Sequence, residues 1–479
     1  MTYSTELFFW FQASVLAVYV LTVASCIVII LKENRNPIRS LSWITALIFL
    51  PVAGLVFYLF FGRSLKNTHR ISRHKKRKLL RSTSKNIDLS VVEMPDSQKN
   101  LIKLTYSLCK TRYCLNNRVA IFTDGENKFR SLMLDLENAS KYILLQYYII
   151  SDDRIGDKIS EILMRKAREG VIVKVIYDHV GSFSTSNKFF NRMREAGIDV
   201  HPFFRVSFPQ LANRINWRNH RKLTIIDGRI GYIGGMNIAD RYIYSSEKES
   251  AWRDTHFRLE GDIIRSMILS FSLDWAFMGQ PIAEADISKH TDHGIKNEVG
   301  VQLVTGGPTE NWDSLSLCFL KAISSATKSI YIQTPYFLPT DTLMNALESA
   351  ALAKIDVRVM IPRNCDSKLL KYASYSYVTQ CLRAGIKIYF YEKTMLHSKA
   401  IIIDDNFVTG GSTNFDFRSL ENNFEANLFI YDKTVNREMR EIFFRDIEDC
   451  SKITIREWHR RPILQRATES VLRLLAPIL

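Results

Sequence analysis

Two stretches of the chain, "HRKLTIIDGRIGYIGGMN" at residues 220–237 and "HSKAIIIDDNFVTGGSTN" at residues 397–414, share one polar pattern. Each begins with a histidine and a lysine two residues apart, followed by an apolar run that ends at an aspartate. The apolar run predicts a buried strand, and a lysine at the start of a buried strand requires a partner. The repeated positions are His220, Lys222, Asp227, Gly235 and Asn237 in the first stretch, and His397, Lys399, Asp404, Ser412 and Asn414 in the second.

The sequence around these stretches repeats as well. Residues 139–149, "ASKYILLQYYI", parallel residues 326–336, "ATKSIYIQTPY". From about residue 115 onward, short β-branched apolar runs alternate with stretches of helical periodicity, which is typical of an α/β protein. Repetition over so long a period indicates a duplicated unit. We therefore expect an α/β fold of two similar half-domains, at residues 116–295 and 296–479.

The repeated polar side chains suit a phosphate. Residues two apart on a strand share a face, so the histidine and lysine of each motif should point the same way. An anion between them would satisfy both, while small residues allow close backbone approach and the asparagine offers an amide donor. With two motifs around one phosphoryl group, one histidine can attack phosphorus and the other can protonate the leaving oxygen. The lysines supply the positive charge, so we expect no metal and no other cofactor.

The acidic residues leave alternatives open. Asp227 and Asp404 could act in catalysis, or each could cap the turn after its strand. A catalytic histidine usually has an acid on its second ring nitrogen. Asp254 and Glu425 follow the histidines of their own halves by 34 and 28 residues, and each lies in a mostly apolar stretch. We expect these two acids to orient the histidines that precede them.

The N-terminal region predicts a membrane hairpin. Residues 7–31 contain no charged residue, and 25 residues of helix extend about 37 Å, enough for a hydrocarbon core of about 30 Å. Residues 41–61 form a second uncharged segment, interrupted by Pro51 and Gly54. Two transmembrane helices are therefore expected within residues 1–61.

Charge orients this hairpin. Residues 62–85 hold ten basic residues and no acid, so this segment supplies +10 of the formal net charge of +16. By the positive-inside rule the segment and all that follows are cytoplasmic, which predicts a multi-pass protein of the cell membrane. We expect residues 62–115 to be a basic linker that attracts anionic lipid. The seven cysteines lack CxxC spacing, which fits a reducing compartment and argues against a zinc site.

The C-terminal tail has an amphipathic pattern. Apolar residues recur at helical spacing among Arg466 and Arg473, namely Ile463, Ala467, Val471, Leu474, Leu475 and Ile478. Such a stripe packs on the protein's own core or lies on a bilayer, and the first outcome is the more common.

The two repeated stretches resemble the paired HxKxxxxD motifs of the phospholipase D superfamily. Residues 36–63, "NPIRSLSWITALIFLPVAGLVFYLFFGR", are similar to the membrane hairpin of bacterial cardiolipin synthases, as are "YIQTPYFLPT" (331–340) and "WRDTHFRLEG" (252–261). The resemblance implies two mixed-sheet half-domains of the phospholipase D fold with one active site between them. It also implies a membrane phosphatidyltransferase that converts two phosphatidylglycerols into cardiolipin and glycerol.

Carried onto this sequence, the resemblance assigns roles to the motif residues. His220 matches the nucleophile, which would form a phosphatidyl-histidine, and His397 matches the general acid and base. Lys222, Lys399, Asn237 and Asn414 match the phosphate-binding groups, and Gly235 and Ser412 are expected to bind the same phosphate. The two motifs are nearly symmetric, so the residues alone do not decide which histidine attacks.

Three other activities and one non-catalytic role are alternatives to this function. A phospholipase D hydrolase would pass the phosphatidyl group to water, and a phosphatidylserine-forming transferase would pass it to serine. A nucleic-acid phosphodiesterase is disfavoured, because the basic excess lies outside the catalytic halves. A catalytically inactive membrane scaffold is disfavoured by two intact motifs. The expected partners are phosphatidylglycerol, other anionic phospholipids and the membrane; the oligomeric state is not indicated.

Overall fold

The computed structural model describes residues 2–32, 37–50, 52–58, 62, 89, 92–206, 216–245, 250–281, 294–296 and 298–476. The chain divides into two compact units. The first comprises residues 1–65 with 206–216, and the second comprises residues 66–205 with 217–479. Each unit is described by itself.

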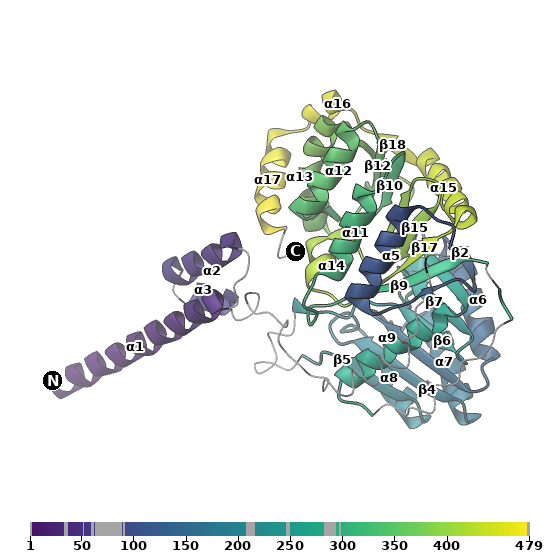
Figure 1. Ribbon diagram of the computed structural model, residues 1–479. Helices are drawn as coiled ribbons and strands as arrows, with labels where there is room; N and C mark the ends of the chain where they lie inside the picture. The colour runs from purple at the N-terminus through teal and green to yellow at the C-terminus, as the bar shows by residue number, and fades with distance from the viewer. Residues whose placement is uncertain are drawn as a thin grey trace. The chain divides into compact units, whose positions relative to one another are not determined.

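The N-terminal unit contains one helix of membrane-spanning length. Helix α1 (Thr2–Lys32) includes Glu6–Lys32, 27 residues of mean hydropathy 2.7, and most of this span is exposed (Figure 1). In the described part of the chain it is the one helix long and apolar enough to cross a bilayer. The first of the two expected spans is therefore present as a single apolar helix.

The second expected span is not one helix. It is divided into α2 (Pro37–Phe49) and α3 (Ala53–Phe57). Helix α2 ends just before Leu50, the residue that precedes Pro51 in the sequence, where proline disfavours helical backbone. Val52 has a φ of 65°, outside the helical range, and the Gly54 backbone NH donates to the Leu50 carbonyl at 2.7 Å. A helix of 13 residues rises only about 20 Å, so α2 alone is too short to span a bilayer.

The first half of the catalytic unit is built on a seven-stranded mixed sheet with the order β2-β8-β7-β6-β3-β4-β5. Strands β3, β4 and β5 are parallel to one another, and the remaining neighbours are antiparallel. The strands are β2 (Asn117–Phe122), β3 (Tyr142–Tyr147), β4 (Ile172–Asp178), β5 (Asp199–Phe203), β6 (Leu223–Ile226), β7 (Ile230–Gly234) and β8 (His256–Gly261).

The second half repeats this topology. Its nine-stranded sheet has the order β1-β9-β17-β15-β14-β10-β12-β13-β18, in which the seven strands from β9 to β13 correspond one by one to the first sheet. The strands are β9 (Gly300–Gly306), β10 (Ser329–Gln333), β12 (Asp356–Pro362), β13 (Lys387–Tyr391), β14 (Ala400–Ile403), β15 (Phe407–Gly411), β17 (Glu425–Tyr431) and the edge strands β1 (Tyr113–Cys114) and β18 (Cys450–Lys452). Strands β11 (Phe337–Leu338) and β16 (Phe415–Asp416) pair separately. Two mixed-sheet α/β halves are confirmed.

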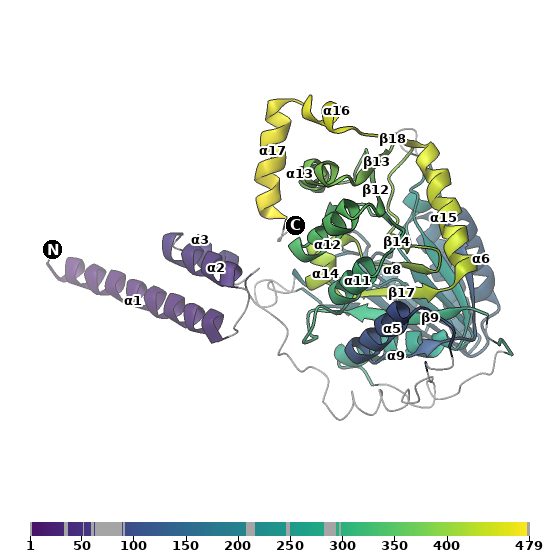
Figure 2. The same cartoon turned by 45° about the horizontal axis from the view of Figure 1, so that its top comes forward.

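Helices cover both sheets (Figures 1 and 2). In the first half they are α6 (Gly125–Glu137), α7 (Arg154–Arg168), α8 (Asn187–Glu195), α9 (Ile263–Phe277) and the short 3-10 helix η4 (Asp240–Tyr242). In the second half they are α11 (Ser314–Ser324), α12 (Asp341–Leu352), α13 (Lys368–Ala384), α14 (Phe417–Glu421), α15 (Lys433–Glu448), α16 (Ile455–His459) and α17 (Ile463–Leu475).

Part of the expected linker belongs to the second half. Within residues 62–115, helix α5 (Asp96–Cys109) packs beside α11 and β9, and β1 pairs with β9 in antiparallel register. Leu101 and Ile102 of α5 are buried in the core of the second half. The boundary predicted at residue 115 is therefore wrong, because amphipathic α5 joins the far half in space (Figure 2). The basic segment 63–85 lies outside the described residues.

The tail forms α17, but with the predicted stripe turned outward. Leu472 and Glu469 face α13 and are buried, whereas Ile463, Val471 and Leu474 are exposed. The expectation that the stripe packs on the core is therefore wrong. The inner face is taken by a buried ion pair between Arg461 and Glu469 (2.8 Å) and by Leu472. Ile478 lies outside the described residues.

Candidate active site between the two halves

The two motifs occupy equivalent places at the starts of two central strands. Strand β6 begins at the residue directly after Lys222, and β14 begins at the residue directly after Lys399. Each lysine ammonium donates to the main-chain carbonyl of its own histidine, Lys222 to His220 at 2.7 Å and Lys399 to His397. The predicted same-face arrangement of each histidine and lysine is consistent with these contacts.

The backbone next to each histidine is bonded to the opposite half. The His220 NH donates to the Phe424 carbonyl at 2.9 Å, and the His397 NH donates to the Arg253 carbonyl at 2.7 Å. Phe424 and Arg253 are the residues just before Glu425 and Asp254. The two halves therefore meet at a pseudo-symmetric pair of bridges, each of which brings an acid of one half to a histidine of the other.

Buried arginines brace this interface. Arg221 contacts both oxygens of Asp274 at 2.7 and 2.8 Å, and also donates to the Glu425 carbonyl at 3.1 Å. Arg253 pairs with Asp446 at 2.6 Å. All four side chains are largely removed from solvent, so each charge depends on its partner. These contacts fix the halves against each other around the motifs.

The acids orient the histidines in a crossed arrangement. The His220 Nδ1 lies 3.0 and 3.1 Å from the two carboxylate oxygens of Glu425, and the His397 Nδ1 lies 2.6 Å from Asp254 Oδ2. Asp254 and Glu425 were predicted as orienting residues, but each was paired with the histidine of its own half. That pairing is wrong, because the interface places each acid opposite the other half's histidine. With Nδ1 facing a carboxylate, Nε2 is the ring nitrogen left for substrate.

Gly235 and Ser412 contact the two acids and do not line a phosphate site. The Ser412 hydroxyl donates to Glu425 Oε2, and at the equivalent position a Cβ on Gly235 would overlap the carboxylate of Asp254. Asp254 is held instead by the Thr255 backbone NH at 2.7 Å. The predicted phosphate-binding role of these two residues is not what the geometry shows. Ser412 supports a longer acid with a hydroxyl, and Gly235 makes room for a shorter one.

The lysines are fully buried and lose much of their basicity. Burial, opposed in part by Glu425, lowers the pKa of Lys222 to about 7. Burial, opposed in part by Asp254, lowers the pKa of Lys399 to about 8. An anion bound beside two such lysines would stabilise their charged forms, since opposite charge favours the ammonium. The pair is therefore suited to hold a phosphodiester.

Without bound substrate, burial favours the neutral form of both histidines. Burial lowers the pKa of His220, although Glu425 opposes this effect. Burial and then the neighbouring Lys399 lower the pKa of His397 to about 4. The His397 Nδ1 also lies 2.8 Å from the Lys399 ammonium and 3.3 Å from the Tyr242 hydroxyl, whereas the His220 Nδ1 faces only Glu425 among its hydrogen-bond contacts. Each histidine thus has a carboxylate at Nδ1, but only His397 also has a lysine ammonium beside that nitrogen.

The predicted asparagines flank the motifs. Asn237 donates to the Tyr242 hydroxyl at 3.1 Å and accepts from the Ile149 NH at 3.2 Å. Asn414 donates to Asp416 at 3.0 Å. Each amide group has two N–H bonds, and these contacts use one of them. A direct role in phosphate binding stays a prediction.

Asp227 and Asp404 stand apart from the histidines. Asp227 accepts hydrogen bonds from the backbone NH groups of Ser140, Lys141 and Tyr142 at 2.7–2.9 Å, and its φ is 54°. Strands β6 and β14, each four residues or about 13 Å long, lie between the lysine and the aspartate of their motifs, so each aspartate is at the far end of the strand from its histidine. These contacts match the turn-capping alternative, and neither aspartate contacts a motif histidine in the described residues.

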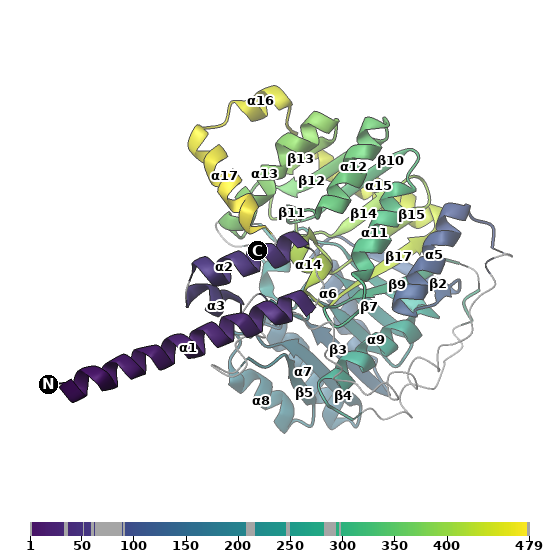
Figure 3. The same ribbon diagram turned by 60° about the vertical axis from the view of Figure 1, so that its left-hand side comes forward.

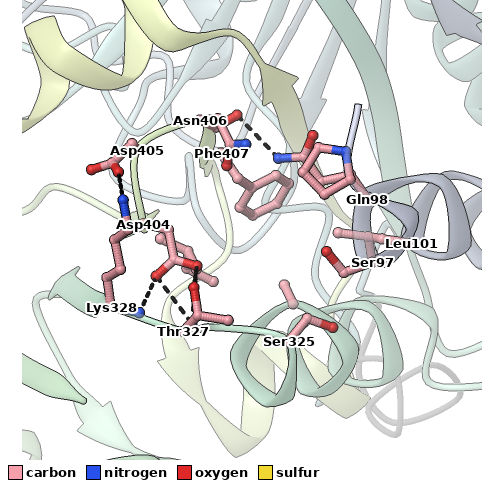
Figure 4. Close-up of a pocket in the computed structure, with 13 residues that line it drawn as sticks. Ser97, Gln98, Leu101, Ser325, Thr327, Lys328, Asp404, Asp405, Asn406 and Phe407 are labelled. Atoms are coloured by element: carbon pink, nitrogen blue, oxygen red, sulfur yellow. Dashed lines mark hydrogen bonds and ion pairs between the residues drawn. The ribbon is translucent and has the colours of Figure 1, made fainter. Parts of the chain in front are cut away.

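Figure 4 shows the second aspartate in detail. Asp404 accepts from the backbone NH groups of Thr327 and Lys328, and beside it Lys328 pairs with Asp405. These residues line a cavity of about 200 Å³ next to α5 that contains neither motif histidine. This cavity is thus remote from the chemistry, and it lies where α5 packs beside the β14–β15 turn.

Aromatic residues that the sequence reasoning missed enclose both histidines. The ring of Tyr148 lies edge-on to His220 at 4.9 Å, and those of Trp252 and Tyr242 lie 5.2 and 5.9 Å from His397. Tyr148 occurs in the repeat segment 139–149 and Trp252 begins the stretch 252–261, but an aromatic residue by itself gives no signal of a site. Only proximity in the fold identifies them. Among the described residues, no cluster of three or more His, Cys, Asp or Glu side chains could hold a metal ion.

Comparison with known proteins gives a consistent family assignment. The sequence model described as "Cardiolipin synthase, PLD-like domain" matches residues 132–272 and 319–447, which include both motifs. A model described as "Phospholipase D-nuclease N-terminal" matches residues 20–63. These two matches cover the N-terminal segment and each catalytic half.

Similar curated proteins span almost the whole chain. The major cardiolipin synthase ClsA of Bacillus subtilis is 38% identical over 96% of this chain and 98% of its own length. A cardiolipin synthase of Geobacillus kaustophilus is 38% identical over 94% of this chain and 91% of its own length. Among solved structures, a phosphatidylserine synthase of Haemophilus influenzae covers 80% of this chain and 100% of its own, with a TM-score of 0.60 and 15% identity, which shows a shared fold.

Proposed function

Because the chain belongs to the bacterial cardiolipin synthases of the phospholipase D superfamily, we propose that it transfers a phosphatidyl group between two phosphatidylglycerol molecules. The products are cardiolipin and glycerol. The observation that carries this proposal is the crossed pair of histidine–acid contacts, His220 with Glu425 and His397 with Asp254, at a single interface. Two oriented histidines on one phosphate allow a two-step transfer without net consumption of a proton.

In the first step, Nε2 of His220 attacks the phosphorus of one phosphatidylglycerol. The bond from phosphorus to the headgroup glycerol oxygen breaks, and His397, which gains a proton once the bound phosphodiester anion offsets the charge of Lys399, gives that proton to the oxygen. A glycerol alkoxide is a poor leaving group, so the proton is needed as the bond breaks. The phosphatidyl group is then held covalently on His220.

In the second step, the glycerol hydroxyl of another phosphatidylglycerol attacks the same phosphorus. His397, now neutral, takes the hydroxyl proton as the phosphorus–nitrogen bond breaks. The proton that left with glycerol is thereby replaced, and His220 is regenerated. Lys222 and Lys399, both buried beside the histidines, stabilise the charge on the phosphoryl oxygens in each step.

The different surroundings of the histidines support this division of roles. Burial and Lys399 lower the pKa of His397 to about 4, so its protonated form is a strong acid. A bound phosphodiester anion would offset the lysine charge and raise that pKa toward neutrality, where proton transfer in both directions is efficient. His220 has no ammonium in hydrogen-bond contact with its Nδ1, which suits a nucleophile.

The proposal includes a membrane arrangement. Residues 1–61 cross the bilayer twice, the second time as the broken helix α2–α3, and the catalytic unit is cytoplasmic. A broken helix is tolerated in a membrane where protein satisfies its freed backbone groups, and the ten basic residues of segment 63–85 favour the cytoplasmic side. A reporter active only outside the cytoplasm should be active when fused after Asn36 and silent when fused after Leu479. Activity after Leu479 would contradict the orientation.

Product analysis tests the reaction. Purified protein in detergent with phosphatidylglycerol as the sole lipid should give cardiolipin and glycerol in equal amounts, as measured by mass spectrometry. His220→Ala and His397→Ala should each lose this activity, whereas Leu134→Ala, at an exposed position on α6, should retain it. Phosphatidic acid as the main product would instead identify a hydrolase.

A further inference from the structure

Helix α17 presents two different faces. Its inner face packs on α13, where Leu472 is buried and Arg473 donates to Gln380 at 2.7 Å. On its outer face the large apolar side chains are open to solvent: Ile463 is 81% exposed, Leu464 80%, Val471 60% and Leu474 81%. Their spacing along the helix places them in one stripe with Ala467 between. We name this stripe, residues 463, 464, 467, 471 and 474, the outer face of α17.

So many exposed apolar side chains on one helix are unusual for the catalytic unit. Elsewhere in the described catalytic unit, exposed large apolar side chains occur one to an element, as with Leu134 on α6 and Leu352 on α12. Isolated exposed apolar residues need no explanation, but a contiguous apolar face on a soluble surface indicates a partner. The outer face of α17 therefore indicates a binding surface.

The charges identify the kind of partner. The one acidic residue of α17, Glu469, is buried and paired with Arg461 at 2.8 Å. Arg466 is exposed on α17, and Arg456 and Arg460 are exposed on and after α16. Arg473 is also exposed, but its guanidinium donates to Gln380 of α13. An apolar stripe bordered by arginines, with its carboxylate turned inward, matches an anionic lipid surface, where acyl chains take the apolar side chains and headgroups take the guanidinium groups.

The position of α17 connects it to the active site. In Figures 1, 2 and 3 the C-terminal end of α17 lies close to α14. Helix α14 follows directly after Asn414 and Asp416 in the sequence and leads to Phe424, the residue that bridges to His220. A surface that contacts α17 thus lies near the segment that carries the second motif.

We propose that the outer face of α17 docks on the anionic bilayer as a second membrane contact of the enzyme, in addition to the N-terminal apolar helix. The contact holds the α14 side of the catalytic unit toward the lipid surface. It rests on the protein's being a membrane enzyme and not on which reaction it performs, so the two proposals can fail separately.

Lipid photo-crosslinking on the full-length protein tests this contact. p-Benzoylphenylalanine is placed at position 474, or at position 352 on α12 as a matched control that is also exposed. The protein is reconstituted in vesicles of equal parts phosphatidylcholine and phosphatidylglycerol, or of phosphatidylcholine alone, and adducts are identified by mass. We expect lipid adducts at 474 in at least about fivefold excess over 352, and a drop of about fivefold or more without phosphatidylglycerol.

Two substitutions complete the test. Val471→Glu should reduce the lipid adducts at 474 by about fivefold or more, because it places a carboxylate within the outer face. Leu352→Glu should leave them unchanged, and thermal unfolding of both variants should match the parent, since both side chains are solvent-facing. Equal adducts at 474 and 352 would overturn the proposal. A cross-link from 474 to a second copy of the chain, seen at twice the mass, would overturn it in favour of self-association.

Discussion

Replacing the acids one at a time distinguishes the crossed pairing from pairing within each half. In Glu425→Gln the side chain keeps its shape, and its amide can donate to the Ser412 hydroxyl that formerly donated to the carboxylate. The protein should therefore fold. However, the amide of the glutamine can present either its oxygen or its nitrogen to Nδ1 of His220. The amide also carries no charge that could stabilise the imidazole of His220 while that ring forms its bond to phosphorus.

The expected loss of kcat in Glu425→Gln follows from the contacts that the substitution removes. The His220 Nδ1 faces both oxygens of a fully buried carboxylate at 3.0 and 3.1 Å, so no water replaces the charge. Loss of the acid in an oriented histidine–acid pair costs about 10⁴-fold in kcat, or about 5 kcal/mol, and we expect about 10³- to 10⁴-fold here. KM should change little, because the lysines that hold the phosphate remain.

The assay uses two phosphodiester lipids that differ in leaving group. With phosphatidylglycerol, Glu425→Gln and Asp254→Asn should both be severely impaired. With a nitrophenyl phosphodiester lipid, whose leaving group needs no proton, Asp254→Asn should recover the burst of nitrophenol, because it weakens only His397. Glu425→Gln should not recover it, because it weakens the nucleophile His220. If the nitrophenyl lipid instead rescued Glu425→Gln and not Asp254→Asn, the result would contradict the combination of crossed pairing with His220 as nucleophile and His397 as acid.

Further outcomes follow from the same contacts. Burial lowers the pKa of Lys222 to about 7 in the folded protein, from about 10.4 in the unfolded chain, so the unfolded chain binds more protons between these pH values. Lys222→Met should therefore raise the free energy of unfolding, by a few kcal/mol below pH 7. In chemical denaturation this increase should become smaller as the pH rises toward 10. Asp227→Asn should lower the unfolding free energy by about 1–3 kcal/mol through its lost backbone contacts, while kcat per folded molecule stays within about twofold. EDTA should leave turnover of detergent-dispersed phosphatidylglycerol intact, and a loss restored by one specific metal would contradict charge stabilisation by lysine.

The sequence predicted the parts of the fold that repeat. Matched apolar runs and the paired motifs predicted two α/β halves, and the alternation rule placed each histidine beside its lysine. It did not predict α5 and β1 on the second sheet, because nothing local in residues 96–114 indicates which half they join. Likewise, helical periodicity identified the stripe of α17 but not its direction, which depends on the buried Arg461–Glu469 pair.

The sequence named the histidines, lysines and orienting acids of the candidate site, but it did not predict which acid contacts which histidine. Asp254 and Glu425 stood out as acids in apolar stretches, yet their sequence distance from each histidine suggested pairing within a half. The pairing is set by the interface, where Phe424 and Arg253 bond to the opposite histidine backbones. Similarly, Gly235 and Ser412 look alike as small residues, and only the positions of the carboxylates reveal their different contacts.

The most direct test of the two-step scheme is to locate the covalent phosphatidyl group. His397→Ala is mixed with a nitrophenyl phosphodiester lipid labelled at phosphorus, quenched in alkaline detergent to preserve phosphohistidine, digested and sequenced by mass spectrometry. The label should reside on the peptide that contains His220 and should be absent in the His220→Ala protein treated in the same way. A label on the His397 peptide of the His220→Ala protein would reverse the roles, and no labelled histidine in either variant or in the parent enzyme would contradict the covalent mechanism.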